Sequence, residues 1–370
     1  MHIQELFLRN FRNYNGLELK ANPYLNILVG DNAQGKTNIL EAVYYTATGR
    51  SHRTSREAEL LQWKEKFFQI VLIAEKYERT FKIEITVLAD GRKKIKVNGV
   101  PKKRISELVG EINVVLFSPE DLMLVKGGPA IRRKYLDVEI SQVNPSYYHN
   151  LLNYNKVLVQ RNNLLRSIRD RKEDPATLEI WNSQLAEFGR RIISKRIEVL
   201  KKITPLARLM HRKITAGQEE LEIRYYCSVD LKDDYAGDNI KDSFLQAISL
   251  RREEEINRGI TLVGPHRDDL GLFIHGKDMR LFGSQGQQRT CALSLKMAEL
   301  EFIRGETGEY PVLLLDDVMS ELDDKRRKFL LEVVYNNIQT FITTTTMNYF
   351  EDIGNKEFAM FKVKDGSIIS

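Results

Sequence analysis

Apolar and polar residues alternate along the first hundred residues in the manner of β-strands. Residues 2–10 and 24–29 alternate or run apolar, and residues 68–100 contain three further β-rich runs. Asp90-Gly91 separates two of these runs and Asn98-Gly99 follows, and both dipeptides favour tight hairpin turns. The pattern therefore predicts a β-rich N-terminal region, with one helix that begins near Lys36.

From about Pro129 to Gly217 the apolar spacing becomes helical. Two stripes, with spacings of three, four or seven residues, are formed by Tyr147, Leu151, Tyr154, Leu158 and Leu165 and by Leu185, Phe188, Ile192, Val199 and Ile203. A polar break around Asp170–Pro175 lies between them. We therefore expect an arm of antiparallel helices, roughly 30–40 Å long, in which most stripe residues serve ordinary core packing.

Strand character returns after Gly217. A strand-like run at Leu221–Ser228 precedes a helix that opens at Gly283–Thr290, an apolar strand at Val312–Leu315, another helix and a strand at Thr340–Thr344. Alternating strands and helices are typical of a parallel α/β layer. The expected fold class is α/β, and the helical arm interrupts one domain rather than following it.

Composition indicates a globular protein outside membranes and the secretory route. Hydrophobic residues make up 42% of the 370 residues and charged residues 29%, which allows a sizeable core and argues against broad disorder. The N-terminal segment lacks the apolar core of a signal peptide, and no apolar run is long enough to span a membrane. Cys227 and Cys291 lie far apart without metal-ligand spacing, so we expect a reducing, cytoplasmic location.

Positive charge is concentrated in the predicted arm. The chain carries +6 in total, whereas residues 151–217 hold fifteen Lys and Arg against six Asp and Glu, and so carry +9. Such a concentration is the footprint expected for binding a polyanion. The candidate DNA contacts are the dibasic pairs Arg190, Arg191, Lys195, Arg196, Lys201 and Lys202. A solvated helix face is an equally good interpretation of any one of them, and Ser51–Arg53 with Lys102–Arg104 form a second candidate surface.

The segment Gly30-Asp-Asn-Ala-Gln-Gly-Lys-Thr37 fits the phosphate-binding P-loop pattern. It lies between the β-like run Leu25–Val29 and a helical segment, so loop N–H groups and a helix N-terminus can face phosphates. Lys36 is expected to reach the β- and γ-phosphates, and the Thr37 hydroxyl to bind Mg²⁺. The expected nucleotide contacts here are Gly30, Asn32, Gly35, Lys36, Thr37 and Asn38.

Two acids follow the apolar strand Val312–Leu315. An acid at the end of a buried parallel strand lies beside a P-loop, so Asp316 is the candidate that holds Mg²⁺ together with Thr37. Asp317 is the candidate that orients or deprotonates the attacking water. With Lys36, these acids form the predicted catalytic set; simple capping of the strand is the alternative.

A third candidate phosphate-binding segment, Gly283-Ser-Gln-Gly-Gln-Gln288, lies at the start of a predicted helix. A serine and a glycine at a helix start present a hydroxyl and N–H groups to an anion. Ser284, Gly286 and Gln287 are therefore candidate nucleotide contacts, although a simple N-cap explains the same residues.

The order of P-loop, SxGQ-type signature, strand acids and the loop Ser320-Glu-Leu-Asp323 resembles the SMC-like branch of the ABC-type ATPases, and within it the RecF family. Further segments that carry the resemblance are Asn10-Phe-Arg-Asn-Tyr14, Gly49-Arg-Ser-His-Arg53, Phe117–Leu122, Val125–Pro129, Arg132-Arg133, Gly264-Pro-His-Arg-Asp-Asp269 and Gly283–Arg289. We therefore expect an ABC-type head with an antiparallel β subdomain, formed by residues 1–125 and 218–370, and a helical arm insertion at residues 126–217.

The resemblance also implies a mechanism. Two ATP molecules are held between the heads of a homodimer, and Ser284, Gly286 and Gln287 of one subunit contact the nucleotide on the P-loop of the other. Arg12 occupies the place of a basic residue near the nucleotide, and Asp323 lies in the loop that crosses the interface. ATP binding closes the dimer on DNA, at single-stranded gaps or duplex junctions, and hydrolysis releases it. RecR and RecO as partners, loading of the RecA recombinase and the SOS response are implied in the same way.

Departures from the family pattern predict slow hydrolysis. Related ATPases carry Glu at the position of Asp317, which is one methylene shorter, and a switch His where this chain has Thr343–Thr346. Ser118 and Glu120 lie where a glutamine loop is usual. We therefore expect a weak, DNA-stimulated ATPase that acts as a switch.

Other functions fit part of the pattern. The cytosolic ATPase subunit of an ABC transporter shares the phosphate motifs, but the basic helical insertion argues against it. A purely structural DNA tether needs a longer arm, and a small-molecule kinase does not need the Gly283–Gln288 signature. Dimerisation on ATP is the observation that separates these functions.

Overall fold

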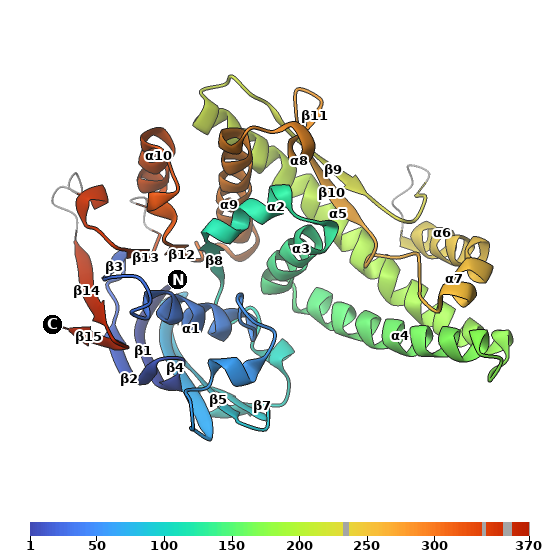
Figure 1. Ribbon diagram of the computed structural model, residues 1–370, viewed down its shortest axis with the longest axis horizontal. Helices are drawn as coiled ribbons and strands as arrows, with labels where there is room; N and C mark the ends of the chain where they lie inside the picture. Colours follow the sequence, from blue (N-terminus) through green and yellow to red (C-terminus); the bar gives the residue numbers. More distant parts are fainter. Residues whose placement is uncertain (232–236, 335–337, 351–356, 370) are drawn as a thin grey trace. The chain divides into compact units, whose positions relative to one another are not determined.

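The computed structural model describes residues 1–231, 237–334, 338–350 and 357–369, and it separates into two units (Figure 1). The first unit comprises Met1–Asp121 and Ala292–Ser370, and the second comprises Leu122–Cys291. Helix α9 (Gln285–Thr307) contributes residues to both units.

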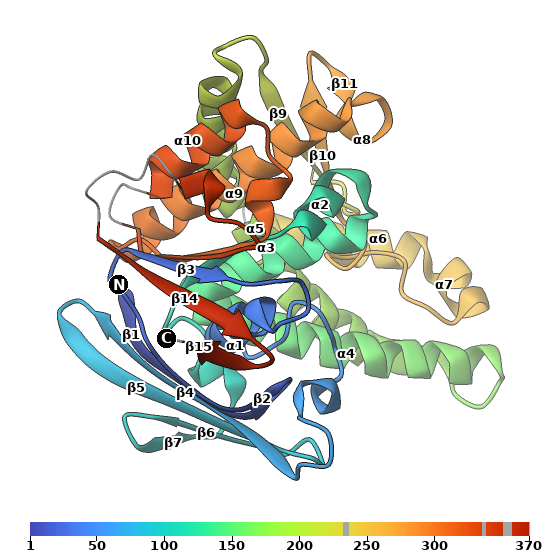
Figure 2. The same ribbon diagram turned by 60° about the vertical axis from the view of Figure 1, so that its left-hand side comes forward.

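A six-stranded antiparallel sheet forms one part of the first unit, as Figure 2 shows. Its spatial order is β2 (Tyr14–Lys20), β1 (His2–Phe11), β4 (Phe67–Lys76), β5 (Arg79–Leu88), β6 (Lys93–Val97) and β7 (Val100–Lys102). The predicted turns Asp90-Gly91 and Asn98-Gly99 join β5 to β6 and β6 to β7, which confirms both. The turn Tyr77-Glu78 joins β4 to β5 and contains no glycine, although both residues adopt a left-handed backbone with φ of 51° and 58°.

A second sheet of the same unit carries the P-loop. Its spatial order is β15 (Ser367–Ile369), β14 (Phe358–Lys364), β3 (Leu25–Val29), β13 (Thr340–Thr344), β12 (Val312–Asp316) and β8 (Val114–Phe117). All neighbours pair in parallel except β14 and β15. Every residue of β12 and β13 is buried, as expected for parallel strands covered on both faces. Helices α1 (Lys36–Thr48) and α10 (Asp324–Val334) complete the alternation of strands and helices.

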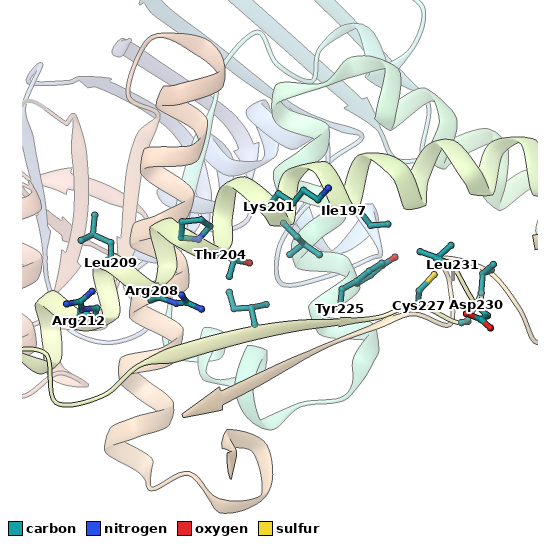
Figure 3. Close-up of a pocket in the computed structure, with 15 residues that line it drawn as sticks. Ile197, Lys201, Thr204, Arg208, Leu209, Arg212, Tyr225, Cys227, Asp230 and Leu231 are labelled. Atoms are coloured by element: carbon teal, nitrogen blue, oxygen red, sulfur yellow. The ribbon is translucent and has the colours of Figure 1, made fainter. Parts of the chain in front are cut away.

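The second unit is largely helical. Its elements are α2 (Met123–Lys126), α3 (Pro129–Val143), α4 (Pro145–Arg169), α5 (Leu178–Thr215), β9 (Leu221–Tyr226), α6 (Gly237–Leu250), α7 (Arg252–Arg258), β10 (Asp269–Ile274), β11 (Lys277–Asp278) and α8 (Met279–Phe282). Helices α4 and α5 pack against each other on either side of the predicted polar break, which confirms the helical insertion. Strand β9 runs along α5 (Figure 3).

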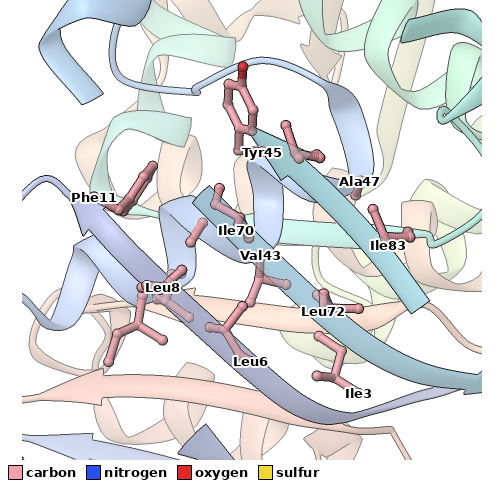
Figure 4. Packing of buried hydrophobic residues seen from close by; sticks show 14 of the residues in the cluster. Ile3, Leu6, Leu8, Phe11, Val43, Tyr45, Ala47, Ile70, Leu72 and Ile83 are labelled. Atoms are coloured by element: carbon pink, nitrogen blue, oxygen red, sulfur yellow. The ribbon is translucent and has the colours of Figure 1, made fainter. Parts of the chain in front are cut away.

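The core of the first unit lies between α1 and both sheets. Val43, Tyr45 and Ala47 of α1 pack against apolar side chains of β1, β4 and β5 (Figure 4). The same cluster includes Leu314 of β12 and Phe341 of β13. Burial of one large apolar side chain contributes roughly 1.5–3 kcal/mol to stability. Contacts with strands of both sheets therefore hold α1, and the P-loop that precedes it, in place. None of the helices in the described ranges has the length and apolar character needed to cross a membrane.

Candidate functional site

The P-loop between β3 and α1 is shaped by close contacts at its glycines. A Cβ atom on Gly30 would lie 2.3 Å from a carbonyl oxygen of β14, and one on Gly35, whose φ is +113°, would lie 2.6 Å from the Asn13 side chain. Asn13 Nδ2 and the Gly366 N–H donate to the carbonyl oxygen of Gln34 at 3.0 and 3.1 Å. The β1–β2 turn and the β14–β15 hairpin therefore support the loop.

Lys36 begins α1 and turns its ammonium group back over the loop. Its Nζ donates to the carbonyl oxygens of Gly30 at 2.6 Å and Asp31 at 2.7 Å. Burial lowers the pKa of Lys36, and the negative charges of Asp317, Asp316 and Asp31 oppose that shift. The loop thus holds a buried cation at its centre, where a phosphate group needs one.

Two threonines hold the first strand acid. The hydroxyls of Thr37 and Thr343 each donate to Asp316 Oδ1 at 2.8 Å, although these residues come from α1, β13 and β12. The Thr343 hydroxyl also accepts the backbone N–H of Asp317 at 2.9 Å. The structure therefore brings the predicted residues Thr37, Asp316 and Asp317 together. Carboxylate and hydroxyl oxygens are hard donors of the kind that Mg²⁺ prefers, so the donor set fits that ion.

Thr343 is a site residue that sequence reasoning missed. Its stretch was considered only for the absence of a histidine, whereas a hydroxyl at the end of the strand beside β12 was the available signal. Asp317 follows in a left-handed backbone with φ of 51°. Burial raises the pKa of Asp317. The negative charges of Asp316 and Glu321 raise this pKa further, and the positive charge of Lys36 opposes the shift.

Arg12 lies on the turn between β1 and β2, and protein groups already bind its guanidinium. Nε and Nη2 donate to the two carboxylate oxygens of Glu41 at 2.8 and 2.7 Å, and Nη1 donates to the Glu59 carbonyl at 2.8 Å. Burial by itself raises the pKa of Glu41, but hydrogen bonds from Arg12 and Ser51 bring it below its ordinary value. A contact between Arg12 and a nucleotide stays a prediction.

Asn38 and Asn32 have different surroundings. Asn38 Nδ2 donates to Asn13 Oδ1 at 2.8 Å, and Arg53 Nη1 donates to Asn38 Oδ1 at 2.9 Å. Asn32 is exposed on the loop. Asn13 and Arg53 are therefore further residues of the loop's surroundings, and both lie in segments that resemble the RecF family.

Ser284 and Gln287 cap the first turn of α9 by reciprocal hydrogen bonds. The Gln287 N–H donates to Ser284 Oγ at 3.2 Å, and the Ser284 N–H donates to Gln287 Oε1 at 3.0 Å. Gln287 Nε2 also donates to Glu219 Oε1 at 2.8 Å. This arrangement is a capping box, so these residues have a local role. Ser284 is exposed, and the nucleotide contacts predicted for Ser284, Gly286 and Gln287 stay predictions.

Most of the basic pairs of α5 lie at the surface with acidic neighbours. Arg190 and Arg191 pair with Glu187, and Lys195 and Lys202 pair with Glu198. Lys201 is exposed. These five residues stay candidate DNA contacts, with part of their charge balanced within the helix.

Arg196 requires a correction, because it is 1% exposed. Its guanidinium donates to Asp137 Oδ1 at 2.7 Å, to the Tyr147 hydroxyl at 3.1 Å and to the Pro265 carbonyl at 2.7 Å. A charge held in such a network cannot contact DNA without leaving costly unpaired partners behind, so its prediction as a DNA contact was wrong. The signal was present, since Arg196 follows Ile192 by four residues and precedes Val199 by three, which puts it on the apolar stripe.

Comparison with known proteins covers the whole chain. The RecF/RecN/SMC N terminal domain family matches residues 2–369. The DNA replication and repair protein RecF of Halothermothrix orenii is 48% identical over 370 residues, which cover 100% of this chain and 98% of the relative. That of Halalkalibacterium halodurans is 43% identical over 368 residues, which cover 100% and 99%.

Solved structures give the same picture. The recombination mediator protein RecF bound to ATP, described as part of the RecFOR pathway, has a TM-score of 0.92 at 39% identity, covering 100% of this chain and 97% of the other. An Smc head domain from Pyrococcus furiosus bound to the C-terminal domain of ScpA has a TM-score of 0.56 at 17% identity, covering 99% and 95%. The second likeness concerns the fold alone, which is that of an ABC-type ATPase head.

Proposed function

This chain belongs to the RecF family, and we propose that it is a cytoplasmic, ATP-dependent DNA-binding protein of DNA replication and repair. The observation that carries the proposal is the cluster in which Thr37 of the P-loop helix and Thr343 both bind Asp316 at 2.8 Å. It joins a P-loop to a strand acid, as ATP-binding sites of this class require. A transporter subunit is not favoured, because relatives matched over their full length are named as DNA replication and repair proteins.

ATP would bind with its phosphates over the P-loop. The N–H groups of Gly30–Gly35 and the start of α1 would face the phosphate oxygens, and Lys36 would exchange its two carbonyl partners for the β- and γ-phosphates. Thr37 and Asp316 would hold Mg²⁺, which supplies charge neutralisation at the phosphates when bound. Asp317 would accept a proton from the attacking water or orient it.

The exposed Ser284 would complete the site of a second subunit. Its hydroxyl caps α9 as an acceptor and keeps its own proton available for a γ-phosphate oxygen. ATP would therefore join two heads into a dimer that holds DNA at gaps or junctions, and slow hydrolysis would release it. We extend the proposal to RecR and RecO as partners, to recombinase loading and to the SOS response on family membership alone.

Two variants with complementary defects test the shared site. Lys36→Ala removes the phosphate-binding cation and Ser284→Arg blocks the signature, so neither protein alone contains an intact composite site. A mixed dimer contains one intact site only if Ser284 acts on the partner's nucleotide. In light scattering, we expect ATP to dimerise the wild type. Neither variant alone should dimerise, and the equimolar mixture should dimerise in part. The proposal would be contradicted if the mixture dimerises no more than its components do, or if the wild type stays monomeric with ATP.

A further inference from the structure

A groove of about 1130 Å³ lies between α5 and β9 in the second unit (Figure 3), and none of its lining residues is assigned to the nucleotide site. Its helical wall carries residues spaced by three, four or seven positions, which places them on one face of α5. The groove residues that matter here are Ile197, Leu200, Lys201, Arg208 and Arg212 on α5, and Ile223, Tyr225, Val229 and Leu231 on and after β9.

Charge and apolar surface are unevenly distributed along the groove. Arg208 and Arg212 lie at one end and are exposed. Arg208 Nε lies 3.4 Å from Glu220 Oε1 and 3.5 Å from the Leu221 carbonyl oxygen, and no described side chain pairs with Arg212. At the other end the apolar side chains are Ile197, Val229 and Leu231, and one charge of each sign, Lys201 and Asp230, lies beside them. The groove therefore matches a ligand with acidic groups at one end and apolar groups at the other.

The floor strand offers backbone groups as well as side chains. In the sheet order β11-β10-β9, β9 is the last strand, so its outer edge has no strand partner within the described part of the chain. Free edges of this kind bind extended peptides by adding a strand. The rise from Arg208 to Arg212 along α5 is about 6 Å, close to the roughly 6.8 Å between alternate residues of a strand. Two acidic residues at alternate positions of an added strand would meet both arginines.

We propose that this groove is a docking site for an acidic and apolar peptide segment of a partner protein, which binds as an added strand on β9. The acidic half of the segment lies against Arg208 and Arg212, and its apolar half lies against Ile197, Val229 and Leu231. The chemistry favours a protein over nucleic acid, because phosphate contacts need only charge whereas half of this groove is apolar. The proposal is independent of the nucleotide switch, since no residue is shared.

The probe is a fluorescein-labelled peptide, acetyl-Thr-Glu-Thr-Glu-Thr-Val-Thr-Leu-amide, used together with its reversed sequence because the strand direction is open. Alternate residues place both glutamates, the valine and the leucine on one face. In two further versions of the peptide, the backbone amides of alternate residues are N-methylated. One version is methylated at the odd-numbered residues and the other at the even-numbered residues. Binding to the full-length protein is measured by fluorescence anisotropy, with and without unlabelled duplex DNA as competitor.

We expect saturable binding of one orientation, which Arg212→Glu weakens at least tenfold and Lys213→Glu, an exposed charge outside the groove, leaves within twofold. One N-methylated version should lose binding and the other retain it, because only alternate amides pair with β9. Circular dichroism shows whether Arg212→Glu is folded, and Arg212→Gln, expected to weaken binding severalfold, is the milder substitution. Absence of binding by both orientations, equal binding of both N-methylated versions, or competition by DNA would overturn the proposal; the last result would assign the groove to a nucleic-acid surface.

Discussion

Thr343 is the residue on which the geometry of the two strand acids depends. Its hydroxyl donates to Asp316 at 2.8 Å and accepts from the Asp317 N–H at 2.9 Å, so a single oxygen fixes one side chain and one backbone group. A threonine hydroxyl does not titrate near neutral pH, so it cannot take the place of a histidine that gains and loses a proton there. Thr343 therefore positions the two acids, and proton transfer is left to Asp317.

Replacing Thr343 by valine keeps the shape and removes both hydrogen bonds. Leaving the partly buried Asp317 N–H without an acceptor is expected to cost about 1 kcal/mol of unfolding free energy, and ATP turnover should fall because Asp316 loses one of its two hydroxyl donors. The measurements are urea unfolding and phosphate release. Thr340→Val, at the other end of β13, is the control and should spare turnover; equal loss of turnover in both variants would contradict a specific role.

The raised pKa of Asp317 predicts how hydrolysis depends on pH. Because its pKa in the folded state lies above the ordinary value of 3.8, the ionised base is lost as the pH falls through that raised pKa, and turnover should fall with it. The same shift means that ionisation of Asp317 disfavours folding at neutral pH, and protonation relieves this effect as the pH falls. Asp317→Asn should abolish the pH dependence in this range and lower turnover by roughly 10²–10⁴-fold.

Only part of the site could be predicted from the sequence. Gly30, Lys36 and Thr37 were accessible because a P-loop is local, with strand, loop and helix adjacent along the chain. Thr343 could not be found in this way, because its proximity to Asp316 depends on β13 lying beside β12. The pairing of Arg12 with Glu41 depends likewise on how the β1–β2 turn packs over α1, which no local pattern specifies.

At the scale of elements, helix α9 has a cap that could also serve a ligand. Ser284→Asp separates these roles, because aspartate is as good an N-cap as serine but brings a negative charge to a candidate γ-phosphate contact. We expect Ser284→Asp to keep the melting temperature within about 2 °C and to lose dimerisation by ATP. Ser284→Ala should instead cost about 1 kcal/mol of stability. Dimerisation of Ser284→Asp at wild-type ATP concentrations would leave Ser284 as a cap alone.

Helices α4, α5 and α7 are joined by a buried guanidinium. Arg161 is fully buried and donates to Asn182 at 2.8 Å, to the Thr261 hydroxyl at 2.7 Å and to Glu255 at 2.6 Å. Like Arg196, it occupies the apolar stripe of its helix. Periodicity therefore located the buried faces of the arm correctly, but it could not identify the hydrogen-bond partners of the two arginines, which come from distant parts of the chain.

Removing the carboxylate from this network should unfold the second unit more easily. Glu255→Ala leaves Arg161 charged and buried, and is expected to cost about 3–5 kcal/mol. The readout is Trp181 fluorescence during urea unfolding, in a Trp63→Phe background that leaves one tryptophan. Glu254→Ala, which removes an exposed partner of Arg251 and Arg258, should cost less than about 1 kcal/mol. Similar losses for Glu254→Ala and Glu255→Ala would contradict the special role of the buried pair.

At the scale of the whole molecule, the uneven charge distribution is the property that bears on DNA. The +9 of residues 151–217 is partly a structural charge, since Arg161 and Arg196 are buried. The division into residues 1–125 with 218–370 and residues 126–217 stays a prediction, as does the DNA surface. Chain-wide patterns of charge predict that a polyanion binds, but which residues touch it depends on packing.

Charge reversal at Lys195, Lys201 and Lys202 tests the arm as a DNA surface. If each lysine contacts one phosphate, the slope of the logarithm of the binding constant for duplex DNA against the logarithm of the salt concentration should become shallower by about 0.9 per contact. Affinity should also fall at low salt. Reversal of Lys102, Lys103 and Arg104 is the matched test of the second candidate surface. If the arm variant keeps its affinity and slope while the variant at Lys102, Lys103 and Arg104 loses both, the DNA binds at the second candidate surface and not at the arm.

The support of the P-loop by the β14–β15 hairpin has a consequence for how the loop folds. Gln34 receives the N–H groups of Asp365 and Gly366, and Gly30 lies against the backbone of β14, so residues 331 or more positions apart along the chain complete one loop. Local folding of the strand, loop and helix around the P-loop motif is therefore not enough to build the loop. Its final shape depends on β14 and β15 joining the sheet that contains β3.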